Sequence, residues 1–184
     1  LAALAVKKLG GTRIVVHAGS ASKISRTRAV ELAKDTLIRA QKALDEAEMS
    51  NVIMCPETLG KVNQLGTVEE ICELCKIDDR LLPCVDFGHV NAMTNGSIKE
   101  KSDYLKILNT IENTLGNDRM KRMHIHFSKI EYTLAGGEQR VEAAVQRQVE
   151  MRHGLLRLRE ALGDDAAHAV VRLHLVGALF VERE

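Results

Sequence analysis

The chain has 184 residues, 45% of them hydrophobic, which is enough for one domain with a sizeable apolar core. Its 26 lysine and arginine residues nearly balance 25 aspartate and glutamate residues, so no overall field draws it to nucleic acid or to membranes. No segment has the pattern of a signal peptide or the length of a membrane span, and a reducing cytoplasm is the simplest expected compartment.

Helices and strands are expected to alternate from the start of the chain. Residues 1–9 are predicted to end a helix that Gly10 and Gly11 close, as though the chain began in the middle of a larger fold. Short runs rich in apolar and β-branched residues predict strands at residues 12–17, 51–55, 81–86 and 120–127. Amphipathic spacing predicts helices at residues 25–48, 67–76 and 97–115, and a loop containing Asn91, Asn95 and Gly96 is expected before the last of these.

Strands that are apolar on both faces and return through helices indicate a parallel sheet. Four such units fit either an open doubly wound sheet or an arc of a (β/α)8 barrel. Each strand delivers a metal-competent side chain near its carboxyl end, and these are His17, Glu57, Asp86 with His89, and His124. Because such ends converge on one rim of a barrel, we predict a partial barrel with a shared metal site. Imidazole and carboxylate ligands suit Zn²⁺, and also Mn²⁺ or Fe.

The fourth strand contains two histidines, His124 and His126. Side chains at positions i and i+2 of a strand share a face, so the two are expected to point the same way. The spacing alone leaves open a metal-binding pair and two core histidines.

Four motifs resemble the successive strand-end motifs of endonuclease IV, a zinc-dependent apurinic/apyrimidinic endonuclease among the xylose isomerase-like TIM barrels. They are VVHAGS at residues 15–20, PETLG at 56–60, DFGHVNA at 86–92 and HIHFSK at 124–129. Their order and spacing also match, and the resemblance covers residues 12–138. It implies about four of the eight units of a (β/α)8 barrel.

The resemblance also implies up to three zinc ions and a ligand set. Glu57 would bridge the first and second ions and so be the principal catalytic residue. The other implied ligands are His17 for the first ion, Asp86 and His124 for the second, and His89 for the third. His126 falls outside the implied ligands and is expected to lie beside them.

The activity implied by the resemblance is hydrolysis of DNA on the 5′ side of abasic sites in base excision repair. Bound divalent ions would activate water and stabilise charge on the phosphodiester oxygens, and the abasic nucleotide would be flipped into the site. DNA with abasic sites is then the expected partner. Lys23 and Arg26 follow the first strand near the rim, and we expect them to contact DNA phosphates, although a solvated helix start explains them equally well.

Two alternatives remain. A sugar isomerase or epimerase on the same barrel would need only one or two metal ions, held by Glu57, Asp86 and His124. Alternatively, the chain is an inactive barrel fragment, which would self-associate through its open strand edges. His17 together with His89 favours the nuclease, because an isomerase has no evident task for a third metal position.

The composition changes at residue 139. Residues 1–138 contain twelve lysines, whereas residues 139–184 contain no Lys, Ser, Thr, Asn, Ile, Pro, Cys or Tyr. We therefore divide the chain into a barrel segment, residues 1–138, and an atypical C-terminal segment, residues 139–184, with a helix at residues 139–162. A shifted reading frame or a foreign joint is our hypothesis for this segment, and a genuine helical appendage is the alternative. Cys72 and Cys75 form a CxxC within a predicted helix, which we interpret as core positions.

Overall fold

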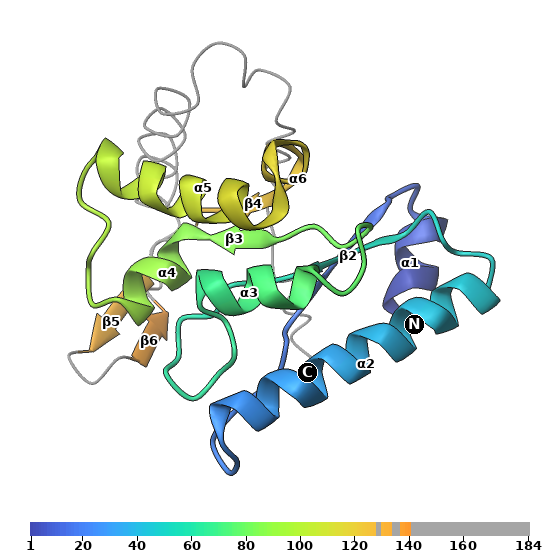
Figure 1. The fold of residues 1–184 in the computed structure, drawn as a ribbon, viewed down its shortest axis with the longest axis horizontal. Coiled ribbons are helices and arrows are strands. Elements are labelled where there is room, and N and C mark those ends of the chain that lie inside the picture. Colours follow the sequence, from blue (N-terminus) through green and yellow to red (C-terminus); the bar gives the residue numbers. More distant parts are fainter. Residues whose placement is uncertain (128–129, 134–136, 141–184) are drawn as a thin grey trace, which may run out of the picture.

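The structure is a computed structural model that describes residues 1–127, 130–133 and 137–140 (Figure 1). Its helices are α1 (Ala2–Lys8), α2 (Arg26–Glu46), α3 (Val68–Cys75), α4 (Phe87–Met93), α5 (Lys101–Leu115) and α6 (Asn117–Arg122). Its strands are β1 (Arg13–Val16), β2 (Ile53–Pro56), β3 (Cys84–Asp86), β4 (His124–His126), β5 (Ile130–Thr133) and β6 (Gly137–Arg140). None of the described helices combines the length and the apolar character that a membrane span requires.

The first four strands are parallel and lie side by side in chain order. β1 pairs with β2, and β3 pairs with β4. Between the pairs, Glu57 forms a parallel bridge with Cys84, and the Leu82 N–H donates to the Met54 carbonyl at 3.3 Å. A doubly wound sheet reverses its strand order at a switch point, whereas consecutive strands are neighbours around a barrel. The described strands therefore form an arc of a barrel.

Helices cover one face of this arc. α2 packs against α3 and α3 against α5, as Figure 1 shows, so the helices follow one another in the same order as the strands. The antiparallel β5–β6 hairpin lies beside α4. This arrangement leaves the opposite face of the four strands as the inside of the arc.

Alternation along each strand separates the two faces. Ile14 and Met54 belong to the core around α2 and α3, and Val85 and Ile125 belong to the core around α3 and α5. The residues between them turn inward, where Cys55, Leu82 and Cys84 form a small apolar cluster. Continuing the alternation to the carboxyl ends of the strands brings the polar residues onto this inner face.

Several local predictions are confirmed. Gly10 has a φ of 73°, and the Gly11 N–H donates to the Val6 carbonyl at 2.8 Å, closing α1 as a left-handed C-terminal turn does. Thr67 and Glu70 form the predicted capping box at the start of α3. Each of the four predicted strands and each of the four helices predicted before residue 116 has a counterpart, with boundaries that differ by a few residues.

Three expectations are wrong. The segment predicted as a loop begins with helix α4, because the Asp86 side chain caps it, and only Asn95 and Gly96, both with positive φ, form the turn that ends it. The first part of the predicted fourth strand, residues 120–122, belongs to α6. Residues 139 and 140 lie in β6 instead of the predicted helix. The rest of that helix lies outside the described residues, and the division at residue 138 stays a prediction.

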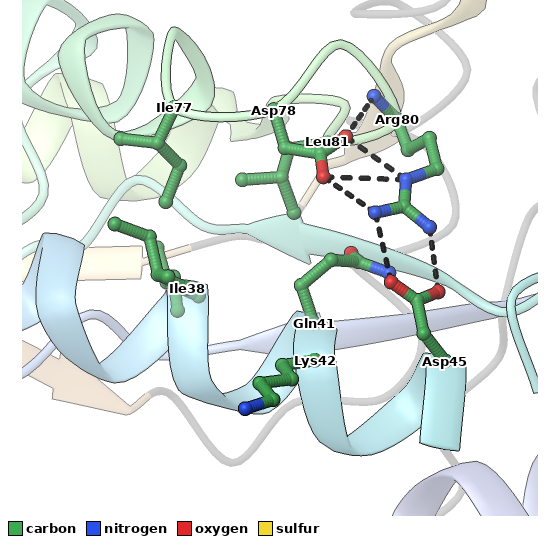
Figure 2. Close-up of a pocket in the computed structure, with 9 residues that line it drawn as sticks. Ile38, Gln41, Lys42, Asp45, Ile77, Asp78, Arg80 and Leu81 are labelled. Atoms are coloured by element: carbon green, nitrogen blue, oxygen red, sulfur yellow. Dashed lines mark hydrogen bonds and ion pairs between the residues drawn. The ribbon is translucent and has the colours of Figure 1, made fainter. Parts of the chain in front are cut away.

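A small cavity of about 210 Å³ lies between α2 and the turn that leads into β3 (Figure 2). Arg80 bridges this gap, because its guanidinium group donates to the carboxylates of both Asp45 and Asp78. The hydrogen bonds from Arg80 are the main reason that the pKa of Asp45 lies below its ordinary value, and the Gln41 amide contributes least. Gln41 is 5% exposed, yet neither of its amide atoms has hydrogen-bond geometry to a described residue. Gln41 is therefore a weak point of this packing.

Candidate metal centre

The carboxyl ends of the four parallel strands place polar side chains on the inner face. His17 follows β1, Glu57 follows β2, and Asp86 is the last residue of β3. In β4, His124 and His126 share this face, and Asp86 is the direct register partner of His126. Neighbouring strands thus bring these side chains to one rim, as the sequence predicted.

Glu57 joins the two sides of the rim. Its side chain is 6% exposed, and its two oxygens face histidines from different strands. Oε2 lies 3.1 Å from Nε2 of His17, and Oε1 lies 2.6 Å from Nδ1 of His126. Burial alone raises the pKa of Glu57, but the hydrogen bond with His126 and the charges of His126, His89 and His17 outweigh burial and hold it below its ordinary value. Glu57 is therefore an ionised carboxylate with both oxygens directed at nitrogen ligands.

Asp86 is held in place by the start of α4. Its Oδ1 accepts hydrogen bonds from the backbone N–H groups of Gly88 at 2.8 Å and His89 at 3.1 Å. Its own N–H donates to the Thr58 hydroxyl at 2.9 Å, which ties the end of β3 to the end of β2. This N-cap fixes Oδ1 of Asp86 in position, and Oδ2 lies 3.6 Å from Nδ1 of His89.

His89 lies on the first turn of α4, next to Asp86. Its Nδ1 is 2.8 Å from the Thr58 carbonyl and 3.6 Å from Oδ2 of Asp86. A carbonyl only accepts hydrogen bonds, so Nδ1 carries a proton, and Nε2 is the nitrogen whose lone pair a metal would bind. Metal-binding histidines are commonly oriented in this way by a hydrogen bond from the other ring nitrogen.

His124 and His126 lie against each other. Their Nε2 atoms are 3.2 Å apart, and the rings meet edge to face with centroids 4.9 Å apart. The hydrogen bond with Glu57 raises the pKa of His126 and outweighs the lowering effect of burial. His124 is the more buried of the two. Both histidines therefore belong to the rim, and His126 makes the closer contact with Glu57.

Comparison with known protein families matches residues 2–162 to the Xylose isomerase-like TIM barrel family. The chain belongs to this family. The match agrees with the order of the described strands and confirms the predicted fold class, a partial barrel. The family includes endonuclease IV and sugar isomerases, and its members often bind metals.

An uncharacterized protein of Methanocaldococcus jannaschii is 39% identical to this chain over 132 residues. The similarity covers 71% of this chain and 46% of the archaeal protein. The chain thus spans about half the length of this relative.

The rim has donor sets that fit a metal ion. Within the described residues, one donor atom each from Glu57, Asp86 and His126 can be chosen so that all lie within 4.8 Å of one another, and the same holds for Cys84, His124 and His126. Carboxylate oxygen and imidazole nitrogen together suit Zn²⁺, Mn²⁺ or Fe²⁺. The arrangement is chemically suited to a metal centre, and the metal's identity and the role of each predicted ligand stay predictions.

Arg26 has protein partners in the structure, and its contact with DNA stays a prediction. Its guanidinium group forms a bidentate pair with Glu70 and also donates to the carbonyls of Val62 and Gln64 at 2.8 and 2.9 Å. Arg26 therefore joins α2 to α3 and to the loop after Glu57, and its donors are directed at protein acceptors instead of at a phosphate. Lys23 is exposed, and its contact with DNA stays a prediction.

Two contributors to the rim were missed in the sequence. His126 was expected beside the ligands, yet it belongs to both donor sets. Its shared face with His124 was the available signal. Cys84, with its Sγ 3.8 Å from Nδ1 of His126, gave a weaker signal, since it lies two residues before Asp86 on an alternating strand.

Proposed function

We propose that this chain carries the metal centre of a zinc-dependent phosphodiester hydrolase of the endonuclease IV kind, which cleaves DNA 5′ to abasic sites. The observation that carries the proposal is the arrangement around Glu57, whose two oxygens face His17 and His126 from opposite sides. A buried carboxylate directed at two sets of nitrogen ligands is suited to bridge two cations. Since the chain spans about half of its relative, the activity is proposed for the whole protein.

Each residue of the rim has a task in this proposal. Glu57 would bridge two ions, with His17 on one side and Asp86 with the β4 histidines on the other. His89, whose lone pair is on Nε2, would extend the site toward a third position. Bound divalent ions would supply charge for the attacking water and the leaving oxygen of a phosphodiester. The protein's contribution is orientation, because the α4 N-cap and the Thr58 hydroxyl fix Asp86 before substrate arrives.

A sugar isomerase or epimerase is the second candidate. Glu57, Asp86 and His126 form a donor set by themselves and would hold a single ion without help from His17. One such ion suffices to polarise a hydroxy-carbonyl substrate. In this reading His17, whose side chain is 63% exposed, would contact substrate instead of metal.

The test is nicking of a DNA duplex with a single abasic site by the whole protein that contains this chain, and by the 184-residue chain alone, each with zinc, with a chelator, and with zinc restored. We expect the whole protein to cleave 5′ to the abasic site, and we expect the chelator to abolish the cleavage. Glu57→Gln should lower the rate of cleavage at least about 100-fold. Changing a residue that only orients a metal ligand lowers activity by up to about 100-fold, and loss of a ligand itself should cost no less. Glu69→Gln, a change at an exposed glutamate of α3, is the matched control and should cleave normally.

Two outcomes would contradict the nuclease. Nicking that resists the chelator and is equal in wild type and Glu57→Gln would show that the metal centre takes no part in the reaction. Zinc binding without nicking by the whole protein would favour the isomerase, to be tested on aldose and ketose sugars. Activity of the whole protein but not of the 184-residue chain would show that the chain by itself is an inactive fragment.

Self-association is a separate proposal about partners. Among the described strands, β1 pairs with β2 alone and β4 pairs with β3 alone, so one edge of each has no strand neighbour. Open strand edges recruit other strands. We expect the 184-residue chain to elute as a dimer or larger species in size-exclusion chromatography with light scattering, and a monomer at all concentrations would contradict this.

A further inference from the structure

Cys84 lies among the histidines of the rim. It is fully buried, faces the inside of the arc, and is the direct register partner of His124 across β3 and β4. His126 lies two residues further along β4 on the same face. Of the four cysteines, all within the described residues, only Cys84 belongs to a metal-capable donor set.

The spacing of these donors fits a tetrahedral ion. With bonds of about 2.05 Å to nitrogen and about 2.3 Å to sulfur, tetrahedral zinc separates two nitrogens by about 3.4 Å and nitrogen from sulfur by about 3.6 Å. The two histidine Nε2 atoms are 3.2 Å apart, and Sγ of Cys84 is 3.8 Å from Nδ1 of His126. These two distances involve different nitrogens of His126. One donor atom can nevertheless be chosen from each of the three residues so that all three atoms lie within 4.8 Å of one another. The three residues therefore lie close enough together to share one ion.

We propose that Cys84, His124 and His126 together bind one zinc ion through a thiolate and two imidazoles. Cys84 and His124 lie one inward-facing residue nearer the amino ends of β3 and β4 than the register pair Asp86 and His126. It deepens the proposed function by adding the Cys84 thiolate to the ion that the β4 histidines would hold there, and it rests on that centre binding zinc. On binding, the thiol proton passes to solvent and the sulfur becomes the ligand.

The donor set also determines which metal is held. Thiolate sulfur prefers Zn²⁺ or Cu⁺, whereas Mg²⁺ and Mn²⁺ prefer oxygen ligands. The site is therefore expected to prefer Zn²⁺ over Mg²⁺ and Mn²⁺.

Cobalt substitution tests this site directly. The zinc-free 184-residue chain is titrated with Co²⁺, and a sulfur-to-cobalt charge-transfer band in the near ultraviolet reports thiolate binding. We expect the band in wild type and in Cys55→Ser, a matched change at another fully buried strand cysteine, and its loss in Cys84→Ser. Zinc affinity should fall about 100-fold in Cys84→Ser alone. A band that survives in Cys84→Ser, or no band in wild type, would overturn the proposal.

A second measurement needs no variant. In zinc X-ray absorption spectra of the wild-type chain, a sulfur neighbour at about 2.3 Å would support the proposal, and a shell of nitrogen and oxygen alone would overturn it. The outcomes separate this inference from the proposed function. Chelator-sensitive nicking without sulfur ligation would support the nuclease and rule out Cys84 as a metal ligand. Sulfur ligation without nicking would support Cys84 as a ligand and count against the nuclease.

Discussion

Arg26→Ala tests whether this arginine is a structural link or a DNA contact. The substitution removes the bidentate pair with Glu70 and two hydrogen bonds to the carbonyls of Val62 and Gln64. In the intact protein the Glu70 side chain is 14% exposed, and without Arg26 it would keep hydrogen bonds only from the N–H groups of Gly66 and Thr67. Removing the arginine therefore leaves a largely buried carboxylate without its cation.

The magnitude follows from the burial of the two partners. Breaking a fully buried pair costs about 3–5 kcal/mol, but the Arg26 side chain is 38% exposed, and solvent screening reduces the effect. We expect the free energy of unfolding to fall by about 2 kcal/mol. Arg26→Lys should cost about half of this, because an ammonium group lacks the fork geometry for a bidentate pair.

The assay is urea unfolding followed by circular dichroism. Arg28→Ala is the control, since Arg28 lies on the same helix and pairs with Glu31 where both side chains are more than half exposed. That change should cost less than about 0.5 kcal/mol. An equal, small effect for both arginines would refute the structural role of Arg26. A phosphate contact would instead appear as a fall of about 1 in the salt slope of DNA binding.

Three further changes have expected outcomes. Gln41→Leu should raise the free energy of unfolding by about 1 kcal/mol in urea, because it removes a buried amide that lacks hydrogen-bond geometry to the described residues and contributes least to lowering the pKa of Asp45; a loss of stability would contradict this. Gly66→Ala should prevent normal folding, seen as a lost unfolding transition, because the new Cβ would lie 2.3 Å from the backbone nitrogen of Leu59; a normal transition would show that this contact relaxes. Burial raises the pKa of Glu70, but hydrogen bonds from Arg26 and the backbone outweigh it and hold the pKa below its ordinary 4.5. Its stabilising contribution is therefore present above pH 4.5 and lost as the pH falls through the lower folded value, and Glu70→Gln should unfold with less dependence on pH in this range; an unchanged pH profile would count against the pair.

Local patterns accounted for much of the fold. Apolar runs separated by amphipathic stretches located the four strands and three of the helices, because strand and helix periodicity depend on neighbouring residues alone. Helix α4 escaped prediction because its start depends on the Asp86 side chain, which was interpreted as a metal ligand and not as an N-cap. The predicted fourth strand began at Met120, an apolar residue close before the apolar run of β4, but Met120 belongs to α6.

The sequence by itself determined that His17, Glu57, Asp86 and the β4 histidines lie at strand ends, since alternation fixes which side chains share a face. Only the tertiary structure decided their partners. Glu57 contacts His126, 69 positions away, because β2, β3 and β4 are neighbours in the sheet. The same adjacency brings Cys84 to the histidines, and helix packing joins Arg26 to Glu70. Such long-range pairs depend on which elements meet in space, and no local pattern in the chain specifies that.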